Sequence, residues 1–147
     1  MIVLGSDHAG FRLKEEIKNF LITEGYEIDD IGVYSQESAD YAISAKKACD
    51  LIVSGKCEKG ILVCGTGIGI SIAANKVKGI RAACCSDYFS AKMTRAHNDA
   101  NVLCMGARVV GTGLALELVD VFLKTDYEGG RHQRRVDQIT DIENGLL

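Results

Sequence analysis

The sequence predicts an α/β protein with a doubly wound, Rossmann-like fold: a three-layer αβα sandwich around a five-stranded parallel sheet. Two observations lead to this prediction. Short apolar runs of strand length alternate with segments of helical periodicity along the chain, which is the pattern of repeated βαβ units. Proline is absent from all 147 residues, so glycine marks the ends of the elements. We expect the strand order 2-1-3-4-5 with right-handed crossovers.

Apolar runs bounded by glycine or polar residues predict the strands. These are expected at residues 2–5, 26–31, 60–63, 80–84 and 102–105. Apolar residues at helical spacing predict the helices between them. The helices are expected from residue 10 to a stop at Gly25, at 41–53, from the glycine loop to 74, and at 88–96, 114–123 and 131–143. We expect a single domain over 1–147, with about 127–147 as a C-terminal helical arm.

Composition excludes several classes of function. With 47% apolar and 25% charged residues and a net charge of −3, the chain is typical of a globular protein with no nucleic-acid or membrane partner. The N-terminal residues lack a signal-peptide pattern, so a cytoplasmic location is expected. Most of the six cysteines stand in apolar surroundings and are expected to be buried, reduced thiols. No histidine is spaced for zinc binding with a cysteine pair, so no metal site is predicted.

The most informative segment is the glycine loop after the third strand, which begins at Cys64 and contains Gly65, Gly67 and Gly69. Its G-x-G-x-G spacing differs from the dinucleotide fingerprint, and no Walker lysine–serine pair is present. A thiol beside backbone N–H groups at a helix N-terminus favours anionic chemistry. The alternative is a tight turn without a ligand, with Cys64 as a small core residue.

Topology brings a second segment to this loop. Asp7 and His8 follow the first strand, which is expected to neighbour the third at the switch point of the sheet. Ligands in such folds bind at the carboxyl ends of the strands around that point. Asp7 is equally suited to cap the first helix, and capping is compatible with ligand contact.

Two further groups lie elsewhere in the expected fold. His97 and Asn98 come before the fifth strand, at the edge opposite Cys64, so His97 is either structural or serves a neighbouring subunit's site. Arg131 and Arg135 are four residues apart on one helix face, which suits a phosphate, although a solvated helix start is the alternative. Together the groups suit proton transfer beside a carbonyl in a phosphorylated metabolite. Cys–His hydrolysis fits less well, because nothing marks an acyl substrate.

Several long motifs occur in an order that resembles a known family. They read GSDHAGF, CGTGIGISIAANK, RAHNDAN, GARVVG and YEGGRHQRRV. The chain resembles type B ribose-5-phosphate isomerases, in the group that also holds the galactose-6-phosphate isomerase subunits. The resemblance implies a cofactor-free aldose–ketose isomerase acting on ribose 5-phosphate and ribulose 5-phosphate. It also implies a homodimer, possible pairing into tetramers, and active sites shared between two subunits.

The resemblance further implies residue roles. His97 would open the furanose ring, Cys64 would carry the proton between C1 and C2, and the Thr66 hydroxyl would shuttle protons between the oxygens. Backbone N–H groups would stabilise the enediolate: those of Gly65, Gly67, Ile68 and Gly69. Sugar hydroxyls or the ring oxygen would bind to Asp7, His8 and Asn98. The phosphate would bind to Arg131, Arg135, His8 and Arg108.

Two positions separate this chain from other members of the family. Some members use a glutamate just after the glycine loop as the base. In this chain Ile70 stands at that position, which leaves Cys64 as the sole candidate base. Ala42 stands where a proline is expected, next to the sugar-binding loops. The same chemistry on an allose, galactose or tetrose phosphate therefore stays open. A non-catalytic sugar-phosphate or nucleotide-binding module is the alternative of another class.

Overall fold

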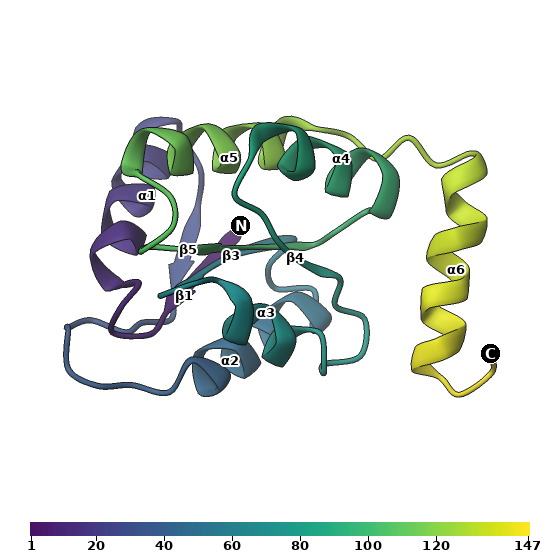
Figure 1. Ribbon diagram of the computed structural model, residues 1–147, viewed down its shortest axis with the longest axis horizontal. Helices are drawn as coiled ribbons and strands as arrows, with labels where there is room; N and C mark the ends of the chain where they lie inside the picture. Colours follow the sequence, from purple (N-terminus) through teal and green to yellow (C-terminus); the bar gives the residue numbers. More distant parts are fainter.

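A computed structural model describes all 147 residues and shows five parallel strands in one sheet with six helices (Figure 1). The strands are β1 (Ile2–Ser6), β2 (Ile28–Asp30), β3 (Lys59–Cys64), β4 (Ala82–Cys84) and β5 (Val102–Gly106). The helices are α1 (Phe11–Thr23), α2 (Tyr41–Val53), α3 (Ile68–Ala74), α4 (Tyr88–Asn98), α5 (Thr112–Lys124) and α6 (Arg131–Glu143). The predicted doubly wound α/β class is confirmed.

The predicted positions of the last two strands are exchanged. The observed order is β2-β1-β3-β5-β4, so β5 lies between β3 and β4. Burial explains the difference: all five residues of β5 are buried, as a strand with neighbours on both sides requires, whereas the three residues of β4 are partly exposed at the edge. Because the chain passes from β3 to β4 at the edge and then back to β5 between them, the order of strand addition reverses. A right-handed crossover therefore places α4 on the face opposite α3.

Helices cover both faces of the sheet. Helices α1, α4 and α5 lie on one face, and α2 and α3 lie on the other (Figure 1). Each face has its own core, of 18 buried residues under α1, α4 and α5 and of 12 under α2 and α3. Alternation along β3 sends Ile61 and Val63 into the first core and Leu62 and Cys64 into the second. The Cys64 thiol therefore lies on the α2–α3 face at the carboxyl end of its strand.

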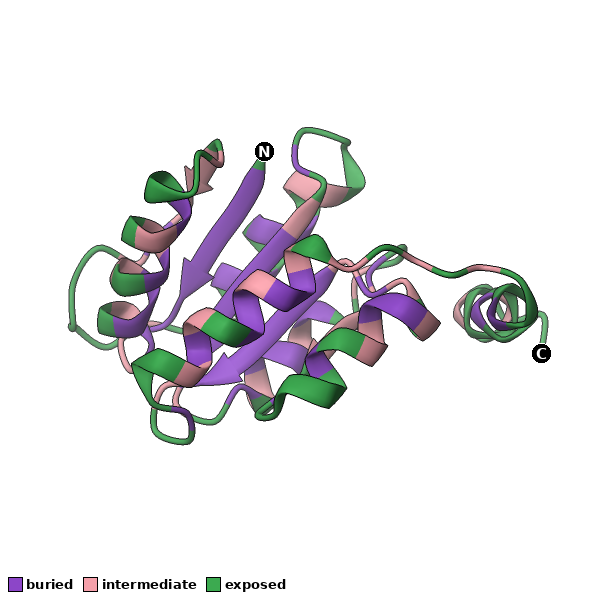
Figure 2. Cartoon of the chain, turned by 90° about the horizontal axis from the view of Figure 1, so that it is seen from above, coloured by how far each residue is buried: buried purple, intermediate pink, exposed green.

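The C-terminal segment, residues 125–147, is called the arm below. Its helix α6 stands to one side of the sheet, and most of its surface is exposed (Figures 1 and 2). Only His132 and Val136 of α6 are buried. A cavity of about 600 Å³ separates the helix from the body, and Ile139 and Ile142 line it. No helix of the chain combines the length and apolar character needed to cross a bilayer.

Candidate functional site

The carboxyl ends of β1, β3 and β5, with the loops that follow them, form one edge of the sheet, called the rim below. The register pairs Ser6 with Val63 and Cys64 with Gly106, so the three strand ends are neighbours. The rim carries most of the residues expected from the sequence to bind or transform a ligand. These are Asp7, His8, Cys64, Gly65, Thr66, Gly67, Ile68, Gly69 and Arg108.

Cys64 occupies the start of the glycine loop, with its side chain buried. Its Sγ accepts a hydrogen bond of 3.1 Å from the Gly67 N–H group. Gly67 has a φ of +78°, and a Cβ there would lie 2.7 Å from the carbonyl carbon of Met105. Only glycine can therefore hold this turn, which aims a backbone N–H at the thiol.

The rest of the loop is built on close backbone packing with β5. A Cβ at Gly106 would lie 2.5 Å from the Thr66 carbonyl carbon, so this glycine lets the loop cross the end of the strand. The Thr66 hydroxyl accepts a hydrogen bond of 3.2 Å from the Ile68 N–H, which begins α3. The first N–H groups of α3 have no partner within the helix. The loop therefore offers an anion site beside a thiol.

Arg108 adds a positive charge above the loop. Its N–H donates to the Gly65 carbonyl at 3.0 Å, and the Ala107 N–H donates to the Cys64 carbonyl at 2.8 Å. The Arg108 guanidinium lies 3.5 Å from the position that a Cβ would take at Gly65. It forms no ion pair within the chain, so its charge is free for an anionic ligand.

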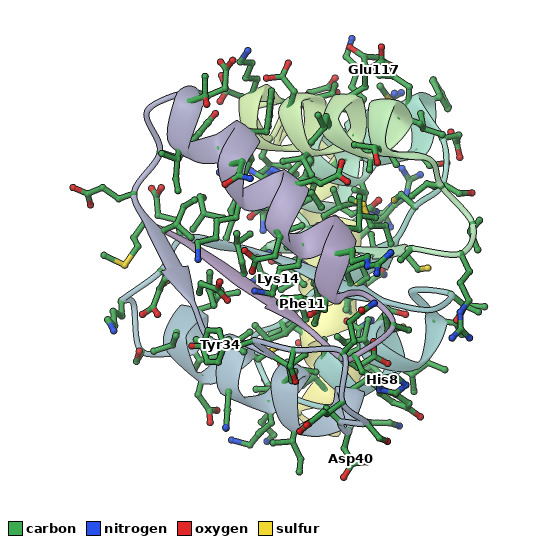
Figure 3. The ribbon with its side chains drawn as sticks, turned by 90° about the vertical axis from the view of Figure 1, so that its left-hand side faces the viewer. His8, Phe11, Lys14, Tyr34, Asp40 and Glu117 are labelled. Carbon is green, nitrogen blue, oxygen red and sulfur yellow. The ribbon has the colours of Figure 1, made fainter.

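Asp7 and His8 complete the rim from β1. The Asp7 carboxylate accepts from the Gly10 N–H at 3.0 Å and closes the turn before α1, whose N-cap is Gly10 rather than Asp7. Nδ1 of His8 lies 3.1 Å from the Ala39 nitrogen and 3.3 Å from the Ala39 carbonyl oxygen, so the Ala39 backbone holds this nitrogen as an acceptor or as a donor, depending on the tautomer. His8 lies at the same end of the molecule as Asp40 (Figure 3). The side chains of Asp7 and His8 are each held by a local hydrogen bond, and each keeps a second polar atom for a ligand.

All six cysteines are free thiols, as predicted, but they differ in environment. Burial raises the pKa of Cys49 and Cys85 to about 11, and it raises the pKa of Cys104 well above its ordinary value. The prediction of a buried core role is wrong for Cys84, which is exposed at the edge strand. Its sulfur lies 3.7 Å from the Thr66 carbonyl oxygen and would lie 2.9 Å from a Cβ at Gly67, so it packs against the glycine loop.

The remaining predicted residues lie at the other end of the sheet, in a second group called the arm end below. His97 and Asn98 close α4, and Arg131 and Arg135 are exposed on the first turns of α6. From Val102 to Gly106, β5 alone spans about 13 Å at the usual rise per residue, so the arm end and the rim of one chain do not meet.

His132 belongs to the arm end, and its role was not predicted from the sequence. Its ring stacks on His97 with centroids 4.2 Å apart and planes 15° from parallel. Its Nε2 lies 3.2 Å from a Glu128 carboxylate oxygen, but without the alignment of a hydrogen bond. The spacing of Glu128 and His132, four residues apart across a Gly–Gly pair, was the available signal.

The donor atoms of His97, Glu128 and His132 lie within 4.8 Å of one another. No metal site is predicted from the sequence, in which His97 is far from the other two residues. Parallel rings direct their lone pairs side by side rather than toward a common ion. The set therefore fits the positioning of His97 better than metal coordination.

Ile70 directly follows the glycine loop, and its side chain is fully buried in the α2–α3 core, in the same cluster as Cys64. The exposed neighbours on α3 are Ile68 and Ile72. An isoleucine has no group that could accept a proton, so Cys64 stays the predicted base, and the case for it depends on its own contacts.

Comparisons with known proteins agree with this architecture. The family model described as Ribose/Galactose Isomerase matches residues 2–139. Ribose-5-phosphate isomerase B of Escherichia coli is 52% identical over 142 residues, covering 97% of this chain and 95% of that protein. The putative sugar phosphate isomerase YwlF of Bacillus subtilis is 48% identical over 147 residues, covering 99% of each.

Solved structures give the same result. Ribose-5-phosphate isomerase B of Clostridium thermocellum superposes with a TM-score of 0.97 at 52% identity and covers 99% of both chains. The Mycoplasma genitalium enzyme, solved with bound ribulose 5-phosphate, superposes with a TM-score of 0.93 at 41% identity, covering 97% of this chain and 95% of that one.

Fold, rim and relatives together define the class of this protein: it is an isomerase. More particularly, the chain belongs to the Ribose/Galactose Isomerase family, whose model spans nearly its whole length.

Proposed function

We propose that the chain interconverts ribose 5-phosphate and ribulose 5-phosphate, with Cys64 moving a proton between C1 and C2 through an enediolate. The observation that carries the proposal is the 3.1 Å hydrogen bond from the Gly67 N–H to Cys64 Sγ. It puts the thiol in the same cradle of N–H groups that suits a developing oxyanion. The Mycoplasma relative with bound ribulose 5-phosphate supports the choice of substrate.

The reaction begins with the cyclic sugar. His97 of a neighbouring subunit takes the proton of the anomeric hydroxyl and delivers it to the ring oxygen as the bond between C1 and that oxygen breaks, which gives the open aldehyde and leaves His97 neutral again. Stacking against His132 holds the His97 ring in one plane. A histidine suits this step because its ordinary pKa lies close to neutral pH.

Proton transfer between the carbons follows at the rim. Cys64, as thiolate, takes the proton from C2, and the electron pair moves to form the enediolate with its charge on O1. The Thr66 hydroxyl passes the proton from O2 to O1, and the Cys64 thiol returns its proton to C1. The product is the ketose, Cys64 is again a thiolate, and the charge on the protein is unchanged. N–H donors of this kind contribute roughly 3 kcal/mol each to the stability of the transition state.

The phosphate is proposed to bind between the two groups of residues. Arg131 and Arg135 would supply guanidiniums from the arm end, and Arg108 and His8 would supply donors from the rim. The three arginines form no ion pair within the chain, so no internal carboxylate competes with the phosphate. Asp7 and Asn98 would bind the sugar hydroxyls.

This arrangement requires a homodimer in which each site combines the rim of one subunit with the arm end of the other. Two features support it. The rim and the arm end of one chain lie at opposite ends of the sheet, and α6 carries the exposed apolar residues Ile139 and Ile142 beside a large cavity. Burying such a surface against a second copy is the usual solution for a symmetric dimer. Pairing of dimers into tetramers is compatible with it.

Turnover and isotope exchange test the proposal. Ribose 5-phosphate, allose 6-phosphate and galactose 6-phosphate are compared by kcat/KM, and the reaction in D₂O is followed for deuterium at C1 of the product. We expect ribose 5-phosphate to be preferred and deuterium to be incorporated. Preference for a hexose phosphate would reassign the substrate, and absence of turnover on all three would favour a binding module.

The matched variants Cys64→Ala and Cys84→Ala test the base. Loss of the base lowers kcat about a thousandfold, whereas loss of the neighbouring Cys84 thiol leaves kcat within about twofold. Sugar-phosphate binding by Cys64→Ala, measured by calorimetry, is retained. A Cys64→Ala variant with unchanged kcat would overturn the proposed mechanism.

A further inference from the structure

A buried lysine takes no part in the proposed chemistry. Lys14 is only 1% exposed, and its ammonium lies 5.6 Å from the ring centroids of both Phe11 and Tyr34 (Figure 3). Burying a lysine costs free energy unless its charge is paired and hydrogen-bonded. The position of this charge therefore points to a specific use.

The partner of Lys14 is the last residue of the edge strand β2. The Lys14 ammonium lies 2.8 Å from both carboxylate oxygens of Asp30, and Lys18 approaches the same carboxylate at 3.0 Å. Glu15, at 2.8 Å from Lys14, adds a second carboxylate at the surface. Asp30 is thus held from one side by two cations, and α1 is fastened to the end of β2.

Asp30 in turn holds the beginning of the loop over residues 31–39. Its carboxylate accepts from the Gly32 N–H at 3.0 Å, and its backbone carbonyl accepts from the Tyr34 hydroxyl at 2.8 Å. Gly32 and Val33 are also hydrogen-bonded to Ser6, at the end of β1. The loop therefore leaves the sheet in a direction that the ion pair fixes.

The far end of the same loop holds a residue of the rim. The Ala39 backbone holds Nδ1 of His8, with the Ala39 nitrogen at 3.1 Å and the Ala39 carbonyl oxygen at 3.3 Å, and so fixes the orientation of the ring. Between Val33 and Ala39, the Arg12–Gln36 hydrogen bond of 3.3 Å at the surface ties the loop to the body. Helix α2, anchored by Ser44 to the Ser6 carbonyl, is the other support of Ala39.

We propose that Lys14 and Asp30 are positioning residues for His8: they fix the loop whose Ala39 backbone orients the imidazole toward the substrate. The proposal rests on the proposed function, in which His8 binds the sugar phosphate. It assigns a use in substrate binding to an ion pair that makes no contact with the substrate.

A double-mutant cycle tests the connection. Lys14→Met removes the charge and keeps the length of the side chain, and it raises the KM for ribose 5-phosphate about tenfold, with kcat changed less than about twofold. In a His8→Ala background, Lys14→Met changes KM by less than about twofold, because the contact it supports is already gone. Equal fold-changes in the two backgrounds would overturn the proposal.

A second measurement does not depend on turnover. Long-range ¹H–¹⁵N spectra of the free protein report the His8 tautomer directly. We expect one predominant tautomer in the wild-type chain, held by the Ala39 backbone, and a mixture of tautomers in Lys14→Met. An unchanged His8 signal would show that α2 alone fixes Ala39, whatever the substrate of the enzyme. A changed signal in a protein with no turnover would contradict the proposed function and leave the positioning role standing.

Two further variants guard against a trivial result. Lys46→Met breaks an exposed ion pair with Asp50 on α2 and changes neither KM nor the His8 signal. If Lys14→Met does not fold, the pair is replaced together in Lys14→Met/Asp30→Leu, which strands no buried charge. Loss of the His8 tautomer preference is expected there too, and its retention would overturn the proposal.

Discussion

The rim and the arm end are built from different materials. At the rim, the groups proposed to form and stabilise the enediolate are a thiol and backbone N–H groups, fixed by strands β1, β3 and β5 and by glycines with no room for a side chain. At the arm end, the ring of His97 is held by stacking on His132, whereas the groups proposed to bind phosphate are long side chains on a helix of which only His132 and Val136 are buried. The difference matches the tasks, because proton transfer needs positions fixed to a fraction of an ångström and phosphate binding by flexible cations does not.

Mixing of inactive subunits tests whether the two regions meet across a dimer. Cys64→Ala removes the rim of a site and His97→Ala removes the arm end, so each variant alone is inactive. After random exchange, half of the dimers are mixed and one of their two sites is intact, which restores about a quarter of wild-type activity. The activity of the mixture is compared with a mixture of Cys64→Ala and wild-type subunits. No recovery, with exchange verified by mass spectrometry, would place both groups in one chain.

Substitution of Gly67 tests the rigidity of the rim. Gly67→Ala combines a positive φ with a close contact to Met105, and we expect about 2–4 kcal/mol of destabilisation and about a hundredfold lower kcat. The control is Gly113→Ala in α5, where nothing lies within 4 Å and where alanine stabilises the helix by about 0.5 kcal/mol. Urea unfolding and turnover are measured on both. Wild-type turnover in Gly67→Ala would mean that the loop geometry is not needed.

Substitution of Arg131 tests the arm end. Arg131→Ala raises KM about tenfold with little change in kcat, because it removes a charge-assisted contact to the phosphate. Arg134→Ala, one helix position before Arg135 and of equal charge, changes KM by less than about twofold. The KM of the wild-type enzyme rises with ionic strength, since these guanidiniums are exposed. Equal effects of the two substitutions would indicate general attraction rather than a defined phosphate site.

The smallest effect expected is on the stability of the rim's support at acid pH. Burial raises the pKa of Asp30, but hydrogen bonds from Lys14, Lys18 and the Gly32 N–H outweigh it, so its pKa lies below the usual 3.8. Its contribution to the free energy of unfolding is therefore complete above pH 3.8 and is lost as the pH falls through the lowered value. Urea unfolding between pH 2 and 6 shows a steeper decline for the wild-type chain than for Asp30→Asn. Parallel curves would contradict a lowered pKa.

Much of the fold could be predicted because its signals are local. The helix boundaries at 41–53 and 131–143 agree with the structure, and the carboxyl ends of β1 and β3 bring Asp7 and Cys64 to one edge as expected. The order of β4 and β5 could not be read from periodicity. The strand order depends on which strands lie at the edge. The complete burial of β5, which marks it as a central strand, is visible only in the folded structure.

The site was predictable to the same extent. The rim could be predicted because its glycine loop is a contiguous motif, and its glycines are required by close backbone contacts. His132 and Lys14 depend on pairing across the fold, with His97 in one case and with Asp30 in the other. An exposed Cys84 was not foreseen because its neighbours in sequence are apolar, while its strand lies at the edge.

The glycine pair before α6 has a consequence for how substrate specificity could change in this family. Gly129 and Gly130 both have positive φ values and set the direction in which the helix leaves the body. On the proposed function, the distance from the helix to the glycine loop measures the number of carbons between the carbonyl and the phosphate. Re-aiming the helix at this joint would select a longer or shorter sugar, while the sheet edge that performs the chemistry stays untouched. The element that would select substrate length, α6, is thus separate from the sheet edge that would carry out the proton transfer.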